Sequence, residues 1–258
     1  MTATAPWSRL RRWLVPHRFL NPANRKWIRI FPRLFLSNRS RHPFDRAHRV
    51  DTSGLIYADG LSSGHEHDIH SAGYYATAPS LFRGAIEHWS ATLKQSQLRL
   101  ADYAFVDIGC GKGRVVMLAA EYGFREAVGI ELNPRLVAVA RRNLNRWMRR
   151  PRVCRQIRIL HGDALSLPIP DGPVVLFFFN SFEEEMVRMW VDRLVTAAAS
   201  RSDPIDLIYL HPEHHNLLTA TPGIRVLSDV DLPLTPEDAA SDAFGVNFDR
   251  CAIYRLLV

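Results

Sequence analysis

The chain has 258 residues, of which 47% are hydrophobic and 23% are charged, which is enough to bury the core of one large domain. Its longest apolar runs, at 115–120 and 174–179, are far shorter than the roughly 20 residues that a membrane-spanning helix needs, so the sequence does not predict an integral membrane protein. Three widely spaced cysteines do not form a disulfide framework and favour the reducing cytoplasm.

The formal net charge of +7 is concentrated at the start of the chain, because residues 1–50 contain 12 Lys and Arg residues and one acid, Asp45. Tryptophan and phenylalanine alternate with these charges, and four prolines within the first 40 residues prevent one continuous helix. We therefore expect a basic arm over residues 1–50. Three roles stay open for it: packing on the chain's own domain, binding an anionic membrane surface as a peripheral cytoplasmic protein, or tracking a nucleic acid, the less favoured partner.

We expect residues 51–100 to form a lid and a lead-in helix, and residues 101–258 to form an α/β domain. Apolar runs predict five strands, at Tyr103–Ile108, Ala127–Glu131, Ile157–His161, Val174–Phe179 and Asp206–His211. The intervening patterns predict helices at Arg114–Tyr122, Pro134–Met148 and Phe182–Ala199.

The end of the chain contains two more apolar runs, Ile224–Val230 and Cys251–Leu257, which are separated by a long acidic loop. This ending suits an antiparallel pair of strands. Together, the elements predict a Rossmann-like mixed sheet of seven strands, mostly parallel with the last strand antiparallel, and with helices on both faces.

A glycine-rich segment, Asp107–Gly113, follows the first predicted strand and precedes a helix. Glycine permits sharp turns and a close approach of the backbone to a ligand, so the segment predicts a nucleotide cofactor. A dinucleotide fingerprint would need a third glycine where Arg114 stands, and a phosphate-binding P-loop would need a longer spacer before Lys112. Both of these cofactor classes are therefore disfavoured.

Acidic residues follow at the ends of the next two predicted strands. Glu131 lies 22 residues after Gly109, where a carboxylate can accept hydrogen bonds from both ribose hydroxyls, and Asp163 can accept one from an adenine amino group. S-Adenosylmethionine carries these groups together with a sulfonium and an ammonium, so it is the favoured cofactor. Taken singly, each acid also has a purely structural interpretation: Asp107 as a loop cap, Glu131 as an arginine partner and Asp163 as a turn cap.

With these motifs, the chain resembles the class I, seven-strand Rossmann-like methyltransferases that depend on S-adenosylmethionine. Asp107–Gly113 matches their first motif, Glu131 their second and Gly162–Ala164 their third, and the resemblance covers residues 44–258. It implies transfer of a methyl group to an unidentified acceptor, which is a protein or a small molecule. A protein lysine or another amine is the leading acceptor.

A narrower resemblance is to a bacterial group of these enzymes whose substrates are largely unassigned. It depends on the phrases Phe44–Arg46, Val50–Gly54 and Phe105–Arg114. Such proteins carry a lid motif, Tyr-x-Pro-Thr, which Tyr74–Thr77 matches with Ala76 in place of the proline. The role of Tyr74 and Thr77 in covering the cofactor is implied by this match.

The same proteins carry Asn-Pro-Phe after the fourth strand, and this chain has Asn180, Ser181 and Phe182 there. In amino-group methyltransferases, the related motif holds the target nitrogen, so Asn180 is the candidate catalytic residue. The residues expected to bind the cofactor are Asp107, Gly109, Cys110, Gly111, Gly113, Glu131, Leu132, Asp163, Ala164, Asn180, Tyr74 and Thr77.

Two histidine clusters, His65–His70 and His211–His215, lack the spacing of a helical zinc site, and no metal is predicted. His211 follows the fifth strand on the ligand side of the sheet, where substrate binding or acid–base chemistry stays open beside the role of a solvated loop residue. Two other functions also stay open: a non-catalytic S-adenosylmethionine or nucleotide sensor anchored by the arm, and an NAD-dependent oxidoreductase, which Arg114 disfavours. The sequence predicts no oligomeric state.

Overall fold

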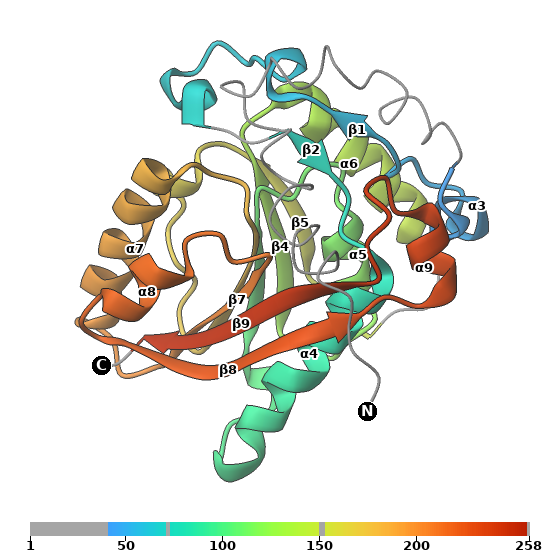
Figure 1. The fold of residues 1–258 in the computed structure, drawn as a ribbon. Coiled ribbons are helices and arrows are strands. Elements are labelled where there is room, and N and C mark those ends of the chain that lie inside the picture. The colour runs from blue at the N-terminus through green and yellow to red at the C-terminus, as the bar shows by residue number, and fades with distance from the viewer. Residues whose placement is uncertain (1–40, 71–72, 150–152, 257–258) are drawn as a thin grey trace, which may run out of the picture.

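The computed structural model describes residues 41–70, 73–149 and 153–256 (Figure 1). The first 40 residues of the expected basic arm lie outside the described residues, and with them the four prolines on which the expectation of a broken helix depends. Among the described residues, no helix is both long enough and apolar enough to cross a membrane.

A seven-stranded sheet forms the centre of the molecule (Figure 1). Its strands, in spatial order, are β5 (Ile157–His161), β4 (Glu126–Glu131), β3 (Ala104–Ile108), β6 (Val174–Phe179), β7 (Ile205–Leu210), β9 (Phe248–Leu256) and β8 (Ile224–Pro233). The first five are parallel, whereas β9 runs antiparallel to both of its neighbours. The predicted mixed sheet with an antiparallel last strand is confirmed.

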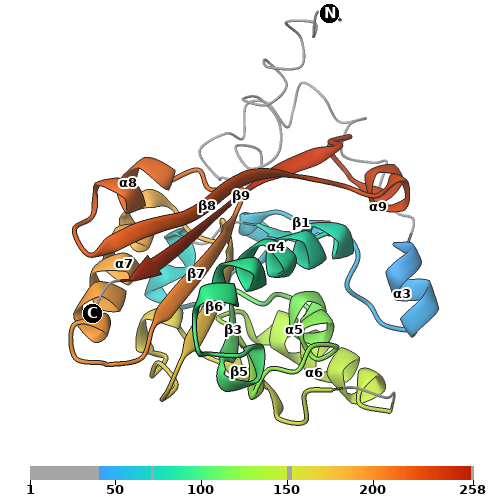
Figure 2. The same ribbon diagram turned by 90° about the horizontal axis from the view of Figure 1, so that it is seen from below.

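Helices cover both faces of this sheet, which explains why the central strands are continuous apolar runs. One face packs against α4 (Pro79–Thr92), α5 (Arg114–Ala119) and α6 (Pro134–Trp147), and the other against α7 (Glu184–Ala198) and α8 (His215–Ala220) (Figure 2). Successive side chains of a strand alternate between the two layers. Phe105 of β3 thus packs in the layer of α4, α5 and α6, and the next residue, Val106, packs in the layer of α7.

The cap of α6 fixes this helix beside the end of β4. The side chain of Asn133 accepts hydrogen bonds from the backbone N–H groups of Arg135 and Leu136, and Pro134 occupies the first helical position. These are the residue types that favour the start of a helix. Because Asn133 follows Glu131 by two residues, the start of α6 lies at the edge of the sheet where the predicted cofactor contacts gather.

Most predicted elements agree with the observed ones to within three residues at each end. Besides α3 (Pro43–His48), the structure adds two six-residue helices that the sequence did not predict, α8 and α9 (Pro236–Ser241). The second interrupts the expected long loop before the last strand, where the side chain of Thr235 caps the helix by accepting from the N–H of Asp238. Helices of this length show less than two turns of periodicity, so a capping residue is their main sequence signal.

Residues 41–70 and 73–78 form a lead-in segment that reaches the edge of the sheet before α4 begins. Its elements are α3 (Pro43–His48), the antiparallel pair β1 (Leu55–Ile56) and β2 (Tyr74–Tyr75), and the 3-10 turns η2 (Ala58–Gly60) and η3 (Glu66–His70). Three more 3-10 turns occur in the described residues that follow, at η4 (Leu93–Gln95), η5 (Leu100–Asp102) and η6 (Ala164–Ser166).

Candidate functional site

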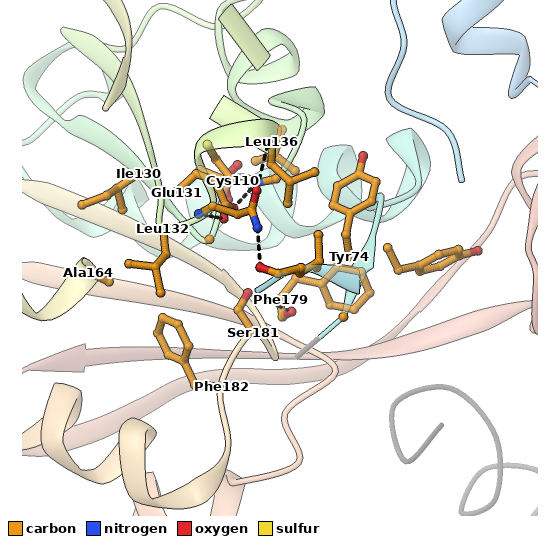
Figure 3. A pocket seen from close by; sticks show the side chains of 18 of the residues that line it. Tyr74, Cys110, Ile130, Glu131, Leu132, Leu136, Ala164, Phe179, Ser181 and Phe182 are labelled. Carbon is orange, nitrogen blue, oxygen red and sulfur yellow. Dashed lines mark hydrogen bonds between the residues drawn. The ribbon is translucent and has the colours of Figure 1, made fainter. Parts of the chain in front are cut away.

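A pocket opens at the carboxyl ends of the parallel strands, where the strand order reverses between β3 and β6. Open α/β sheets bind their ligands at this position. The lining comes from the loop after β3, the ends of β4 and β5, the segment after β6 and strand β2 of the lead-in segment (Figure 3). Five stretches that are far apart in the sequence therefore meet at one edge of the sheet.

The glycine loop forms one wall of this pocket in a left-handed backbone conformation. Gly109 has a φ of 72° and Gly111 a φ of 54°, which would cost other residues about 1 kcal/mol or more. The space is equally restrictive, because a Cβ on Gly111 would lie 2.3 Å from the ring of Tyr74 and one on Gly109 would lie 2.7 Å from the hydroxyl of Ser181. The loop therefore packs tightly against β2 and against the segment after β6.

Four backbone N–H groups of this loop, those of Gly109, Cys110, Gly111 and Gly113, are already bonded within the protein. Gly109 and Cys110 both donate to the carbonyl of Ile130, at 3.0 and 2.9 Å, and Gly113 donates to the carbonyl of Cys110 at 2.8 Å. Gly111 donates to the carboxylate of Glu131 at 2.8 Å. A loop that cradles phosphates needs such N–H groups free to bind the ligand. This arrangement supports the exclusion of a P-loop and of a dinucleotide pyrophosphate site.

Glu131 is a buried carboxylate at the end of β4 that lines the pocket (Figure 3). Its Oε2 accepts from the N–H of Gly111 and its Oε1 from the N–H of Asn133, each at 2.8 Å. Burial raises its pKa, and these hydrogen bonds oppose that shift. Each carboxylate oxygen can accept a second hydrogen bond, so Glu131 can bind a ligand diol while it holds the glycine loop.

Asp107 of β3 is a second buried carboxylate in the lining. Burial raises its pKa well above the usual 3.8, and the nearby charge of Glu131 adds to the shift. Among the described residues, none donates a hydrogen bond to this side chain. A cationic ligand would offset the repulsion between the two carboxylates and favour the ionised form of Asp107. The pair therefore suits an ammonium or a sulfonium.

Asp163 follows β5 and carries two contacts. Its Oδ1 accepts from the N–H of Leu165 at 3.0 Å, which caps the η6 turn, and its Oδ2 lies 3.1 Å from Nδ1 of His67. Asp163 and His67 both line the pocket. Asp163 is thus a turn cap and a pocket residue at once, and His67 brings the η3 turn to this side of the pocket.

Arg114, the first residue of α5, joins the lead-in segment to the pocket. Its guanidinium donates to the hydroxyl of Thr52 at 2.7 Å and to the carbonyl of Thr77 at 3.1 Å, and it lies 3.7 Å from Asp45. Asp45 is fully buried and also accepts from the N–H and the hydroxyl of Ser53, both at 2.7 Å. Although burial disfavours its charge, these bonds and Arg114 lower the pKa of Asp45. Arg114, which stands where a dinucleotide fingerprint would have its third glycine, therefore anchors the lead-in segment.

Tyr74 is held over the glycine loop by the same part of the chain. Its hydroxyl donates to the carbonyl of Thr52, and the ammonium of Lys112 lies 5.2 Å from the centre of its ring. Asn143 of α6 accepts from the N–H of Asp51 at 2.9 Å and donates to its carbonyl at 2.8 Å. The Val50–Gly54 phrase thus makes hydrogen bonds that fix the lead-in segment to α6 and to the tyrosine over the loop.

Most of the residues predicted to bind the cofactor lie in this pocket. Its lining contains Asp107, Gly109, Cys110, Gly111, Glu131, Leu132, Asp163, Ala164, Tyr74 and Thr77. Gly113 and Asn180 are not part of the lining. Gly113, with a φ of 83°, precedes α5, and a Cβ there would lie 3.3 Å from that of Ala140, so this glycine allows α5 to pack on α6.

Asn180 is buried at the end of β6, next to the lining. Its Oδ1 accepts from the hydroxyl of Tyr209 on β7 at 2.6 Å, and its φ of 40° is left-handed. The two residues that follow it, Ser181 and Phe182, line the pocket instead (Figure 3). Asn180 does not cap α7, which begins after Glu183. Its bond to Tyr209 braces the turn that presents Ser181 and Phe182, and a catalytic role for its side chain stays a prediction.

Sequence reasoning did not identify several other residues of the lining: Leu61, His67, Asp68, Arg114, Leu136 and Met186. Met186 lies four residues after Phe182, so a helical spacing from the recognised motif would have found it. Leu136 is likewise in the first turn of the helix that Asn133 caps. Leu61 has no such local signal. His67 and Asp68 belong to the His65–His70 cluster, whose place at the pocket could not be predicted because the approach of η3 to the strand ends is a long-range contact.

The histidine clusters have different environments. His67 lines the pocket, whereas His211 follows β7 with its Nδ1 2.8 Å from a carboxylate oxygen of Asp249 and its Nε2 3.8 Å from one of Glu213. Burial opposes protonation of His211, but these two acids raise its pKa to about 9. It is therefore a cation at neutral pH and a poor proton acceptor there. Within the described ranges, no group of three or more His, Cys, Asp or Glu side chains could hold a metal ion.

The chemistry of the lining fits S-adenosylmethionine. Four carboxylates contribute to it, those of Asp68, Asp107, Glu131 and Asp163, whereas its arginine, Arg114, already contacts Asp45. The negative charge suits the sulfonium and ammonium, and Glu131 and Asp163 keep acceptor capacity for ribose and adenine. The loop offers no phosphate cradle, and this cofactor needs none.

Comparisons with known proteins agree with this assignment. Residues 105–201 match the family model described as a methyltransferase domain. A stretch of 52 residues is 48% identical to the adenine nucleotide translocase lysine N-methyltransferase of Mus musculus, covering 20% of this chain and 22% of that protein. A stretch of 83 residues is 29% identical to a protein-lysine N-methyltransferase of Saccharolobus islandicus (strain REY15A), covering 32% and 49%. The matches thus span less than half the length of either relative.

Among solved structures, the N-methyltransferase NodS of Bradyrhizobium japonicum WM9 aligns with a TM-score of 0.46 and 13% identity, over 68% of this chain and 96% of that one. The family match covers the strands and loops that carry Asp107, the glycine loop, Glu131 and Asp163. These residues occupy the positions of the three motifs in the observed sheet. Over residues 105–201 the chain therefore matches a methyltransferase domain, and this domain lies on a mixed seven-strand sheet with the Rossmann-like strand order.

Proposed function

We propose that this protein transfers the methyl group of S-adenosylmethionine to an amine nitrogen, and that the side chain of a protein lysine is the acceptor. The observation that carries the proposal is the pocket lined by the buried Asp107 and Glu131 at the ends of β3 and β4. The bound cofactor supplies an electrophilic methyl carbon. The chain's own residues then have to bind the donor, exclude water and align the acceptor nitrogen.

The part of the pocket that would bind the methyl donor is formed by two carboxylates, Glu131 and Asp107, and by Tyr74. Glu131 would accept hydrogen bonds from the ribose, and Asp107 would supply a counter-charge at the cationic end of the cofactor. Tyr74, which is buried and contacts the glycine loop, covers the loop and limits access of water. Such a dry, preorganised environment strengthens the electrostatic contacts inside it.

The acceptor side is formed by the segment after β6, where Phe179, Ser181, Phe182 and Met186 line the pocket. An amine must lose its proton before it attacks, and an apolar wall lowers the pKa of an entering ammonium by desolvation. The matched relatives are both named as lysine methyltransferases, which supports a lysine as the acceptor. The narrower assignment to one bacterial group stays a prediction.

The donor is tested by calorimetry of S-adenosylmethionine, S-adenosylhomocysteine and NAD with the whole chain. We expect both sulfur nucleosides to bind. We also expect a large loss of affinity in Glu131→Ala, since a carboxylate that bonds two hydroxyls contributes about 1.5 to 3 kcal/mol per bond. Binding of NAD alone would refute the methyltransferase proposal.

The acceptor is tested by transfer of a labelled methyl group into a fractionated lysate, followed by acid hydrolysis of the protein fraction. We expect labelled methyl-lysine in that fraction. Label confined to lipid, nucleic acid or small molecules would refute a protein lysine. Tight cofactor binding with no transfer into any fraction would support instead a non-catalytic sensor, which the methyltransferase domain itself does not favour.

A further inference from the structure

A strongly basic hollow lies between α3 and the end of α6, apart from the cofactor pocket. Its lining includes five arginines, which we call the arginine patch: Arg41, Arg46, Arg49, Arg146 and Arg149. All five side chains belong to exposed residues. The one acid in the lining, Asp45, is fully buried and directed to Thr52 and Ser53. It therefore does little to neutralise the patch at the surface.

The guanidinium groups of the patch make no ion pair with any residue that the structure describes. Arg46 donates to the carbonyl of Arg41 at 2.5 Å, and Arg146 donates to the carbonyl of Arg49 at 3.3 Å. These bonds fix the direction of two side chains without cancelling their charge. Several cations held close together without an anion favour a partner with several negative charges.

The position of the patch within the fold is fixed by two sequence features. Arg49 has a left-handed φ of 57° and ends α3, while Arg146 and Arg149 lie at the end of α6, where the negative pole of the helix stabilises cations. Phe44 of α3 and Trp147 of α6 stack on each other with ring centroids 5.7 Å apart. The apolar contact between the two helices therefore brings arginines from distant parts of the sequence onto one surface.

We propose that the arginine patch binds the phosphate headgroups of an anionic phospholipid surface. The guanidinium group matches a phosphate oxygen pair in shape and charge. The choice of a lipid surface depends on the sequence directly before the patch. Residues 1–40 contain nine more Lys and Arg residues together with Trp7, Trp13 and Trp27, and tryptophan between basic residues is typical of segments that bind at the membrane–water interface.

The patch and the cofactor pocket lie at opposite ends of α6. Asn133 and Leu136 at the start of α6 line the pocket, and Arg146 and Arg149 at its end line the patch. A helix of this length separates them by about 20 Å. Changes in the patch should therefore alter membrane binding without altering cofactor affinity, and the proposal does not depend on the methyl acceptor.

The test compares three full-length chains on vesicles of phosphatidylcholine with and without phosphatidylglycerol. The patch variant is Arg46→Gln, Arg146→Gln and Arg149→Gln, and the control variant, with the same net charge, is Arg99→Gln, Arg188→Gln and Arg225→Gln. Each basic residue at an anionic surface contributes roughly a fivefold change in partitioning, so the patch variant should lose on the order of 100-fold. The control should stay within about threefold of the unmodified chain, since it leaves the patch intact.

Calorimetry with S-adenosylhomocysteine shows whether each variant is folded, and unchanged affinity is expected. Equal losses in the patch and control variants would overturn the proposal, since net charge alone would then explain binding. So would partitioning that does not depend on phosphatidylglycerol. Patch-dependent binding to a DNA or RNA duplex with no binding to vesicles would assign the patch to nucleic acid, and patch-dependent binding of inorganic phosphate alone would reduce it to a small-anion site.

Discussion

The contact between the glycine loop and Tyr74 can be tested by Gly111→Ala. At this position, a Cβ would lie 2.3 and 2.5 Å from two ring atoms of Tyr74, and the residue would keep a φ of 54°. Tyr74 is buried and its hydroxyl bonds the carbonyl of Thr52, so the ring cannot turn away without breaking that bond. We expect a left-handed alanine to cost about 1 to 2 kcal/mol and the overlap with the ring to cost about 1 to 3 kcal/mol more.

A matched control separates these two costs. Gly245→Ala places an alanine at a φ of 67° with no atom within 4 Å of its Cβ, so it carries the backbone cost without the overlap. The overlap should also disappear when the ring is removed. In the double variant Gly111→Ala, Tyr74→Ala, the loss should fall below the sum of the single losses by about 1 to 3 kcal/mol.

Urea unfolding with an unchanged m-value measures these differences in the free energy of unfolding. Calorimetry of S-adenosylhomocysteine provides a second measure, since an alanine at 111 also displaces the loop that Glu131 holds. Two results would refute the reasoning: a loss in Gly111→Ala no larger than in Gly245→Ala, or a loss that is undiminished when Tyr74 is absent. Either would mean that Tyr74 and the glycine loop do not touch as the structure describes.

Three predictions concern pH. Because burial and the charge of Glu131 raise the pKa of Asp107, the cofactor-free protein should lose stability as the pH rises above 3.8. Urea unfolding across pH should show a smaller loss in Asp107→Asn, where the raised pKa of Glu131 still contributes. Although burial disfavours its charge, bonds from His42 and Ser80 lower the pKa of Asp238 to about 2. Its carboxylate should therefore stabilise the fold above pH 3.8, and this contribution should be lost as the pH falls to about 2. In urea unfolding at neutral pH, Asp238→Asn should lower the free energy of unfolding by about 1 to 2 kcal/mol. In Asp249→Asn, an NMR titration should show the pKa of His211 falling from about 9 toward 6.5. In the unmodified protein, the charge of His211 stabilises the fold fully below pH 6.5, and this contribution is lost as the pH rises through about 9. Asp249→Asn should reduce that contribution.

The sequence predicts the sheet and the cofactor wall well because their signals are local. A buried strand, a glycine turn and a carboxylate at the strand end are all encoded within a few residues of each other, as at Asp107–Gly113 and Glu131. The parallel order of the strands then brings these ends to one edge. Local pattern and topology together thus account for most of the predicted lining.

The parts that could not be predicted depend on contacts between distant residues. In the sequence, Arg114 is informative only because it disfavours a dinucleotide-binding motif. In the structure, it donates hydrogen bonds to Thr52 and Thr77, which lie 62 and 37 residues away. For Asn180, the motif predicts a contact with the substrate, which stays a prediction, but it does not predict the hydrogen bond that the amide oxygen accepts from Tyr209 of the next strand, 29 residues later. No local pattern reports which partner a buried polar side chain will find across a sheet.

These contacts also indicate where the pocket opens for exchange of the cofactor. Residues 45–53 are fixed by Arg114, Asp45 and Asn143, and breaking a buried charge pair costs about 3 to 5 kcal/mol. The contact of His67 with Asp163 is weaker, because both side chains keep some exposure, at 20% and 13%. Solvent competes for that contact and lowers its contribution. We therefore expect the η3 turn, and not the Tyr74 side of the lead-in segment, to move when the adenosine enters or leaves.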